Sequence, residues 1–423
     1  MPERSDRELW LERYRSVRAQ TIKLAEPLSV EDQVVQTIWF ISPTKWHLAH
    51  TSWFFETFIL RPHLPGYVPL SEEFNYLFNS YYNSVGEQFP QARRGMIARP
   101  GVAQVHAYRA HVDAAMSECL PGLSASDWEI VRGLLDVGLH HEQQHQELLV
   151  TDIKHVFAQN PLHPVYIDRA PTTPRPPEEL RWRSFDEGVY EVGHHTADFC
   201  FDNELPRHKT YIHGFELAHR PSTNAEFIAF MEDGGYSDPR HWLSDGWATV
   251  KQQRWEAPMY WERVDGRWHT MTLSGLLPVD PNEPVCHISY YEADAFATWA
   301  GARLPREHEW ELAAVSSTQT SGDFLESARY HPSPSEAATT DFRALLGGVW
   351  EWTASPYTAY PGYRQAEGAL GEYNGKFMCN TIVLRGGSCA TPESHIRETY
   401  RNFFSPQTRW QFSGVRLAKD SSR

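Results

Sequence analysis

The chain has 423 residues, more than a single hydrophobic core usually accommodates, so we expect two domains. Its formal net charge is −15 and no run of lysine or arginine interrupts this acidic balance, so we expect neither nucleic acid nor a membrane surface as a partner. No apolar run reaches the roughly 18 residues of a membrane-spanning helix.

The first part of the chain predicts a helical bundle. Apolar residues recur at three- and four-residue spacing in four stretches, at 7–28, 34–60, 102–120 and 128–159. Ser42-Pro43 is typical of a fresh helix start, and Ser126 or Asp127 is expected to cap the fourth helix. With a long connection between the second and third stretches, residues 1–160 predict a four-helix bundle.

After the helical part, the composition of the sequence changes and prolines become frequent. Six of them lie between residues 161 and 177, so residues 161–185 predict a linker. From residue 186 to 423, short apolar stretches alternate with Gly, Pro, Asn and Asp, and helical patterns are confined to 223–233, 291–299 and 306–314. We expect an irregular α/β domain there, which makes the fold class α+β.

The cysteines indicate a compartment. Five of them are scattered along the chain without a C-x-x-C pair, which suits reduced thiols better than a disulfide framework. The first residues also lack the apolar stretch of a secretory signal. We therefore expect a cytoplasmic protein.

A histidine pair lies in the fourth predicted helix, in the run His141-Glu142-Gln143-Gln144-His145. Histidines four residues apart stand on one helix face, so both imidazoles can reach a single metal ion. The run also matches the zinc-protease pattern H-E-x-x-H, in which the glutamate is the general base. Leu148 and Thr151 stand where the metzincin continuation needs glycine and a third histidine, so this alternative is weaker.

A third metal ligand must come from another helix, and His50 is the best candidate. Trp46, His50 and Trp53 recur at helical spacing, which places His50 on an inward, aromatic face. The neighbours His47 and His140 are one residue away from the candidate ligands, so we expect them on other faces. A hydrogen-bonded core role for the histidines remains the alternative.

Motifs in both halves resemble one known family. Ser42-Pro43-Thr44-Lys45-Trp46-His47-Leu48-Ala49-His50 and the His141–His145 run resemble the DinB-like bundle of the ergothioneine-biosynthesis sulfoxide synthases (EgtB-like). The second half resembles the formylglycine-generating-enzyme-like (sulfatase-modifying factor) domain of that family, a C-lectin-type fold. Its motifs here are Arg303-Leu304-Pro305, Glu309-Trp310-Glu311, Gly348-Val349-Trp350-Glu351-Trp352-Thr353, Arg385-Gly386-Gly387-Ser388 and Gly414-Val415-Arg416-Leu417-Ala418.

The resemblance implies an iron-dependent oxidoreductase, a hercynine oxygenase or hercynylcysteine S-oxide synthase. Such an enzyme uses Fe(II) and O2 to join a cysteine thiol to C2 of the imidazole of hercynine. The implied iron ligands are His50, His141 and His145, in agreement with the helical faces. Three neutral imidazoles would leave three positions of an octahedral ion for thiolate, substrate imidazole and O2, and the retained charge would favour thiolate.

The resemblance also implies substrate contacts. Gln144 would meet the hercynine imidazole, while Asn402 and Phe403 would meet its trimethylammonium group, Phe403 through its π-face. Phe404 stands where the best-known branch has an aspartate for the amino end of γ-glutamylcysteine, so we expect free cysteine to be favoured, with γ-glutamylcysteine still possible.

Arg93 and Arg94 are the nearest cations for the cysteine carboxylate. Each of these assignments has a structural alternative. Gln144 could be a solvent-facing helix residue, residues 402–404 could belong to a buried strand, and Arg93 and Arg94 could be a surface pair.

The catalytic tyrosine does not follow the best-known branch, which supplies it from the second domain. No such residue aligns here with Tyr357, Tyr360 or Tyr363. We expect Tyr82 instead, with Tyr81 as second choice, because a phenol near the metal could donate a proton and steer thiol oxidation toward C–S bond formation. Simple packing of the two rings is the alternative.

Two other functions stay open from the sequence. One is a DinB-type zinc enzyme that transfers thiols, and the other is a non-enzymatic binding module, since C-lectin-type folds often only bind. Cys379 and Cys389 are ten residues apart, which does not fit the close pair of reactive cysteines in formylglycine-generating enzymes.

Overall fold

The computed structural model describes residues 5–168, 178–317, 322–334 and 342–421. The chain forms two compact units, of which the first comprises Met1–Leu162 with Glu367–Glu372 and the second comprises His163–Ala366 with Tyr373–Arg423. Of the predicted linker 161–185, residues 169–177 lie outside the described residues, whereas Trp182–Phe185 form a strand.

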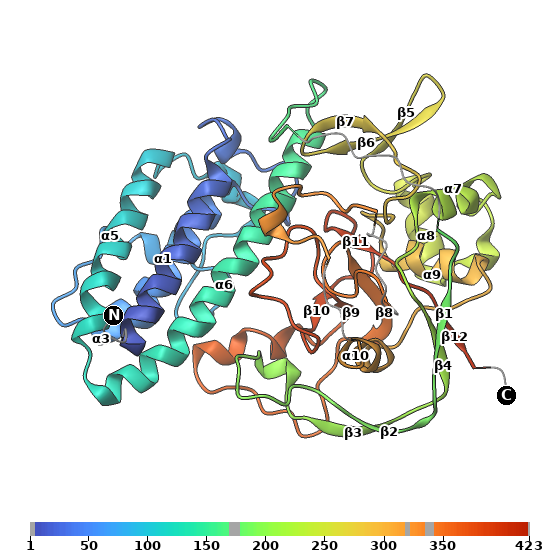
Figure 1. Ribbon diagram of the computed structural model, residues 1–423. Helices are drawn as coiled ribbons and strands as arrows, with labels where there is room; N and C mark the ends of the chain where they lie inside the picture. Colours follow the sequence, from blue (N-terminus) through green and yellow to red (C-terminus); the bar gives the residue numbers. More distant parts are fainter. Residues whose placement is uncertain (1–4, 169–177, 318–321, 335–341, 422–423) are drawn as a thin grey trace. The chain divides into compact units, whose positions relative to one another are not determined.

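Unit 1 contains the predicted helical bundle (Figure 1). Its long helices are α1 (Asp6–Ala25), α2 (Thr44–Phe55), α5 (Val102–Gly122) and α6 (Ala125–Ala158). Helix α2 packs against α5 and α6, and α1 packs against α6 and α5. The connection from α2 to α5 carries the π-helical turn η2 (Glu56–Leu60), α3 (Arg61–His63), α4 (Phe74–Phe78) and the 3-10 turn η3 (Gln91–Met96).

The fresh helix start predicted at Ser42-Pro43 is confirmed to within one residue, whereas the predicted cap of the fourth helix was wrong. Residues 32–34 form a separate 3-10 turn, and α2 begins only at Thr44, with Pro43 in extended conformation at its N-cap. Helix α6 is capped by Ser124, whose hydroxyl accepts a hydrogen bond from the Asp127 backbone N at 3.1 Å. Ser126 and Asp127 therefore lie inside the first turn, because Ser124 is the residue with non-helical backbone.

Unit 2 is the irregular α/β part of the predicted α+β fold, with short strands in four sheets among the described residues. Their orders are β1-β4-β12, β10-β9-β8-β11, β2-β3 and β5-β6-β7, and β8 with β11 is a parallel pair. The strands are β1 (Trp182–Phe185), β2 (Gly188–Val192), β3 (His208–Ile212), β4 (Phe215–Ala218), β5 (Trp261–Val264), β6 (Arg267–Thr272), β7 (Gly275–Pro278), β8 (Trp350–Pro356), β9 (Ile382–Arg385), β10 (Asn402–Phe404), β11 (Ser413–Gly414) and β12 (Ala418–Asp420).

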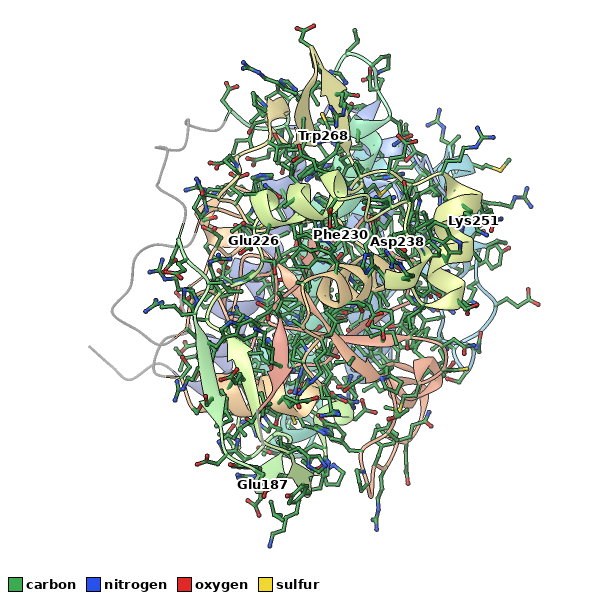
Figure 2. The ribbon with its side chains drawn as sticks, turned by 90° about the vertical axis from the view of Figure 1, so that its right-hand side faces the viewer. Glu187, Glu226, Phe230, Asp238, Lys251 and Trp268 are labelled. Carbon is green, nitrogen blue, oxygen red and sulfur yellow. The ribbon has the colours of Figure 1, made fainter. Side chains whose placement is uncertain are left out.

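The three helices predicted in this half are present as α7 (Asn224–Glu232), α9 (Tyr290–Trp299) and α10 (Glu307–Val315). A further helix, α8 (Ser244–Gln253), was missed because it buries only Gly246 and Val250, too few residues to produce an apolar period. Figure 2 shows the contrast between the buried ring of Phe230 on α7 and the exposed Lys251 on α8.

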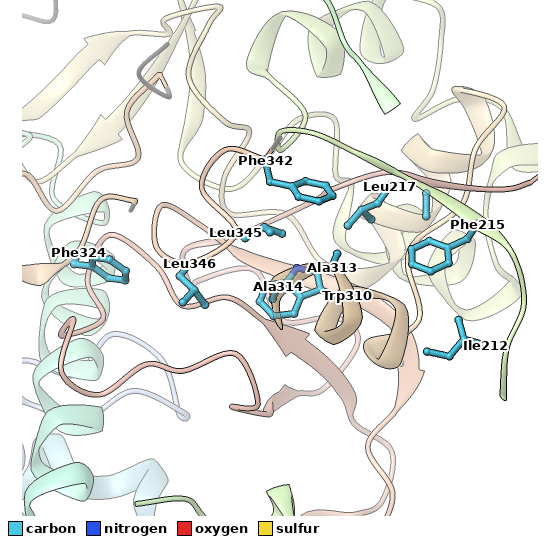
Figure 3. Packing of buried hydrophobic residues seen from close by; sticks show 11 residues of the cluster. Ile212, Phe215, Leu217, Trp310, Ala313, Ala314, Phe324, Phe342, Leu345 and Leu346 are labelled. Carbon is cyan, nitrogen blue, oxygen red and sulfur yellow. The ribbon is translucent and has the colours of Figure 1, made fainter. Parts of the chain in front are cut away.

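One buried apolar cluster of unit 2 gathers around α10 (Figure 3). Trp310 on this helix is fully buried and packs with Phe215, Leu217 and Leu345 in one apolar cluster. Its indole Nε1 donates a 2.6 Å hydrogen bond to Glu351, so a polar group of β8 anchors the helix from within the core.

No helix in the part of the chain that the structure describes combines the length and apolarity that crossing a membrane requires.

Helices α2 and α6 approach closely at Gly138, one turn before His141. A Cβ atom built on Gly138 would lie 2.6 Å from Cε1 of Phe55 and 3.0 Å from Cε1 of Phe54, both on α2. Both rings are fully buried, so they have little room to move. The absence of a side chain at residue 138 thus lets the two histidine-bearing helices meet.

This close approach yields a stability prediction. Gly138→Ala should lower the free energy of unfolding of the helical unit by about 1–3 kcal/mol, because the added methyl overpacks the α2–α6 contact. Gly133→Ala, on the same helix but with open space around its Cα, should instead raise stability by up to about 1 kcal/mol through helix propensity. Chemical denaturation followed by circular dichroism measures both, and equal shifts for the two variants would contradict the packing argument.

Candidate metal centre

Three histidine side chains converge inside unit 1. His50 lies within α2, and His141 and His145 lie one turn apart on α6. One nitrogen from each ring lies within 4.8 Å of the others, and the Nε2 atoms of His50 and His141 are 3.1 Å apart. Over the described ranges, no other group of three or more His, Cys, Asp or Glu side chains comes this close.

The spacing and chemistry of these nitrogens fit a metal ion. Two nitrogens bound about 2.1 Å from one ion at a right angle lie about 3.0 Å apart, close to the distance between His50 and His141. Imidazole is a ligand for iron and zinc alike, and three ligands on one side leave an octahedral ion with open positions.

Hydrogen bonding orients the lone pair of His50. Its Nδ1 lies 2.5 Å from the backbone oxygen of Phe78, and because a carbonyl can only accept, Nδ1 carries the proton. The lone pair is therefore on Nε2, the atom that faces His141. A ligand ring held by its second nitrogen in this way is a common feature of protein metal sites.

Burial keeps the three imidazoles neutral. It lowers the pKa of His141 to about 3, although the neighbouring Glu142 carboxylate acts in the opposite direction. Burial also lowers the pKa of His50 and of His145 well below the usual value, and positive charge on the other histidines would lower it further. All three rings therefore offer lone pairs at neutral pH.

Two indoles enclose the His50 ring. Trp46, one turn earlier on α2, stacks on it with a centroid distance of 4.6 Å and an interplanar angle of 12°. Trp53, on the following turn, stacks at 5.4 Å and 15°. The indole N–H groups are held by Leu77 O at 3.1 Å and by the Asn75 side chain at 2.9 Å, so the stack itself is anchored.

Glu142 has a structural role, which argues against the zinc-protease alternative. One oxygen of its buried carboxylate accepts hydrogen bonds from the Thr21 hydroxyl at 2.6 Å and Arg109 Nη2 at 2.8 Å, and the other accepts one from Arg18 Nη1 at 3.0 Å. Although burial opposes it, these two guanidinium groups lower the pKa of Glu142 to about 2. A carboxylate this acidic and this fully engaged is a poor general base.

The two predicted tyrosines lie in the loop that follows α4. Tyr82 is fully buried, and its ring lies 5.5 Å from that of Trp53 and 6.4 Å from that of Phe54. Those two rings contact His50 and His141 respectively, so Tyr82 is one aromatic neighbour away from both. Tyr81 stacks on Tyr82 at 4.7 Å, and burial raises the pKa of Tyr81.

The two predicted arginines differ in their surroundings. Arg93 is exposed, whereas Arg94 is buried and holds its guanidinium 3.4 Å above the Trp46 ring. Nη1 of Arg94 donates to the Ser42 hydroxyl at 2.9 Å, while its buried Nε has no hydrogen-bond partner within the described residues. Burial lowers the pKa of Arg94 to about 9, although the nearby Asp152 carboxylate acts in the opposite direction.

The remaining predicted contacts lie on two elements. Gln144 is half-buried on α6, next to His145. In unit 2, residues Asn402–Phe404 form β10, and because strand side chains alternate, Asn402 and Phe404 share one face. The Phe403 ring lies on the other face and stacks on Tyr357 at 4.1 Å and 8°, which covers one side of its π-system.

Two residues that the sequence patterns did not indicate, His47 and Asp152, support the cluster. His47 Nδ1 lies 2.8 Å from His145 Nδ1, and His47 Nε2 lies 3.0 Å from Asp152 Oδ2. Neither His47 nor His140 belongs to the group of three, but His47 contacts it. The position of Asp152, two turns after His145 and hence on the same face of α6, was the available signal.

Comparisons with known proteins cover both halves. Residues 13–149 match the DinB superfamily, and residues 178–340 and 327–421 match the sulfatase-modifying factor enzyme 1-like domain. The hercynine oxygenase of Mycolicibacterium thermoresistibile is 32% identical, over 90% of this chain and 88% of that protein. The hercynine oxygenase of Mycobacterium tuberculosis is 30% identical, over 95% and 96% respectively.

One solved structure, PvdO from Pseudomonas aeruginosa, overlaps 58% of this chain and 100% of its own at 15% identity, with a TM-score of 0.41. That overlap is too weak to support a functional comparison.

The Glu142 network gives a testable prediction. Glu142→Gln should destabilise the protein by about 3–5 kcal/mol, because it leaves Arg18 and Arg109 buried without their carboxylate. The folded-state pKa of about 2 lies below the ordinary 4.5, so this stabilisation is complete above pH 4.5 and is lost as the pH falls toward 2. Denaturation at several pH values measures it.

Glu129→Gln is the matched control, since Glu129 lies on the same helix with an exposed partner, Arg132, at 4.0 Å. This surface pair should contribute less than about 1 kcal/mol. Similar losses in both variants would contradict the role given to Glu142.

Proposed function

Since the chain belongs to the hercynine oxygenase family, with a DinB-superfamily part and a sulfatase-modifying-factor part, we propose that it is an Fe(II)- and O2-dependent sulfoxide synthase of ergothioneine biosynthesis. Its substrates are hercynine and a cysteine thiol, and its product carries sulfur on C2 of the imidazole. His50, His141 and His145 hold the iron.

One observation carries this proposal: three buried, neutral imidazoles with converging nitrogens in a DinB-type bundle. Neutral ligands leave a divalent ion with its full charge, which favours a bound thiolate. When bound, iron(II) supplies the activation of O2, which a zinc ion in the same ligands does not. The protein's own residues supply the positioning and the proton.

The reaction balances with these reactants alone. The thiol S–H and the imidazole C2–H bonds break, and a C–S bond forms. One oxygen atom of O2 becomes the sulfoxide oxygen, and the other leaves as water with the two hydrogens. O2 is the only oxidant, so no further reductant is needed.

Tyr82 is assigned as the proton donor and Tyr81 as its neighbour. The fully buried Tyr82 ring is held by Trp53 and Phe54, which contact the iron ligands. Asn79 fixes the loop, since its side chain donates to the Tyr82 backbone oxygen at 3.1 Å and accepts from the Tyr82 backbone N at 3.2 Å. A phenol fixed in this way can transfer a proton without first reorganising.

Arg94 is assigned to the carboxylate of the thiol substrate. Arg94 makes no direct ion pair within the described residues, and a buried guanidinium in that state favours an incoming anion. Its position on Trp46 places it one ring away from His50. The exposed Arg93 lacks these constraints and serves at most to attract the anion.

The hercynine contacts are assigned to Gln144 and to residues of β10. Gln144 neighbours the ligand His145 and can hydrogen-bond the imidazole nitrogen. On β10, Asn402 offers a polar contact. The Phe403 ring, which stacks on Tyr357 at 4.1 Å, is assigned as the π-face for the trimethylammonium group. Phe404, whose ring meets that of Trp410 edge-on at 5.1 Å, is assigned to the thiol substrate.

The deciding experiment loads the protein with Fe(II) and incubates it in air with hercynine and cysteine, with products identified by mass. We expect the sulfoxide adduct. His141→Ala and His145→Ala should lose both iron and product, because two imidazoles do not hold a reactive ion. His140→Ala should keep the iron. Activity with zinc, or without O2, would instead support a thiol transferase.

Tyr82→Phe tests the proton donor. We expect sulfoxide formation to fall by on the order of 10²–10⁴ while hercynine binding is kept, because only the hydroxyl is removed. Thiol oxidation to sulfinate should then become the main reaction. Tyr81→Phe is the matched control, with a smaller effect, and an unchanged sulfoxide yield in Tyr82→Phe would move the role elsewhere.

The thiol preference is tested at residue 404. We expect free cysteine to be used better than γ-glutamylcysteine by roughly 10–100-fold in kcat/KM, because Phe404 offers no charge to the second amino end. Phe404→Asp should recover activity with the dipeptide, whereas Phe404→Asn, of similar shape but uncharged, should not. A clear preference of the unmodified enzyme for γ-glutamylcysteine would contradict this assignment.

A further inference from the structure

His145, His47 and Asp152 form a continuous hydrogen-bonded chain that starts at a metal ligand. The two Nδ1 atoms of His145 and His47 are 2.8 Å apart, and Nε2 of His47 is 3.0 Å from Oδ2 of Asp152. We propose that Asp152, acting through His47, is a positioning residue that fixes the tautomer and ring orientation of His145 and so sets the affinity of the metal centre. The inference rests on the proposed metal centre and deepens it.

The proton positions follow from the partners. An ionised carboxylate only accepts, so Nε2 of His47 must donate to Asp152. A neutral imidazole with its proton on Nε2 has its lone pair on Nδ1, so Nδ1 of His47 accepts from Nδ1 of His145. His145 then carries its proton on Nδ1, and its lone pair is on Nε2, as the metal requires.

Asp152 is well placed to hold this arrangement. The same Oδ2 atom accepts a 2.9 Å hydrogen bond from the backbone N of Ser42, just before α2 begins. Asp152, His47 and Ser42 are all at least nine-tenths buried, so bulk water does not compete for the hydrogen bonds among them. One carboxylate oxygen on α6 thus fixes both the start of α2 and the ring of His47.

The hydrogen bonds from His145 through His47 to Asp152 also link the metal centre to the assigned thiol site. The hydroxyl of Ser42 accepts from Arg94, while the backbone N of Ser42 donates to Asp152. Groups that orient a ligand from behind typically change metal affinity by 10–100-fold when removed. The effect of this His145–His47–Asp152 relay should therefore be measurable as a change in metal affinity, without turnover.

The test measures affinity for Co(II) and Fe(II) by anaerobic competition with a chelator. His47→Phe keeps a flat ring but cannot accept from His145, so we expect affinity to fall by about 10–100-fold. His47→Gln supplies an amide oxygen for His145 and an N–H for Asp152, so it should recover most of the affinity. His140→Phe is the matched control, because His140 is one residue from His141 but takes no part in the hydrogen bonds from His145 to Asp152. This variant should bind metal like the unmodified protein.

A second pair of variants keeps the test decisive where His47→Phe fails to fold. In Asp152→Asn the amide oxygen can still accept from His47 and Ser42, whereas in Asp152→Leu nothing accepts. We expect a smaller loss for the asparagine variant than for the leucine variant. Circular dichroism and the melting temperature confirm that each compared variant is folded.

The outcomes distinguish a failure of the His145–His47–Asp152 relay from a failure of the proposed metal centre. Unchanged affinity in folded His47→Phe, or equal losses in His47→Phe and His47→Gln, would overturn the relay, and so would equal losses in the two Asp152 variants. Absence of metal binding in the unmodified protein would instead overturn the metal centre itself.

Discussion

The geometry of unit 1 depends on one buried carboxylate, that of Glu142. Arg18 and Thr21 of α1 and Arg109 of α5 donate to it from two other helices. The same guanidinium groups continue to α2, where Arg18 donates to Ser52 at 2.8 Å and Arg109 donates to the Leu48 oxygen at 3.0 Å. All four long helices are therefore tied to one point beside His141. Because an unpaired buried charge is costly, this network restrains how α2 and α6 pack and where their histidines meet.

The candidate metal centre and this ionic network occupy different faces of the same helix turn. On one side α6 presents neutral imidazoles among indole and phenyl rings, and on the other it presents a charged network. The separation has a physical reason, since guanidinium groups next to the imidazoles would compete with a bound cation, whereas the aromatic rings exclude water without adding charge. Arg94 does reach the aromatic side, and Trp46 stands between it and His50.

In unit 2 the motifs that carried the family resemblance hold the fold together. Glu351 pairs with Arg416 and also accepts from Trp310, and Glu311 pairs with Arg385, all within the buried interior. These residues lie in the Glu309–Glu311, Gly348–Thr353, Arg385–Ser388 and Gly414–Ala418 segments. A domain with short strands and long loops gains little from regular hydrogen bonding, and buried charge pairs with specific partners hold such loops in place. The motifs therefore identify the fold, while the assigned substrate contacts fall on other residues.

Local periodicity in the sequence was enough to predict four long helices, the shared face of His141 and His145, and the inward face of His50. It also predicted α7, α9 and α10, because each buries an apolar stripe. The groups that meet across separate elements were set by tertiary packing. This packing turned Glu142 toward two arginines, brought His47 onto His145, buried Arg94 while leaving Arg93 exposed, and put Phe403 opposite Asn402 and Phe404. Spacing along a helix or strand fixes the direction of a side chain, but its partner depends on how separate elements pack.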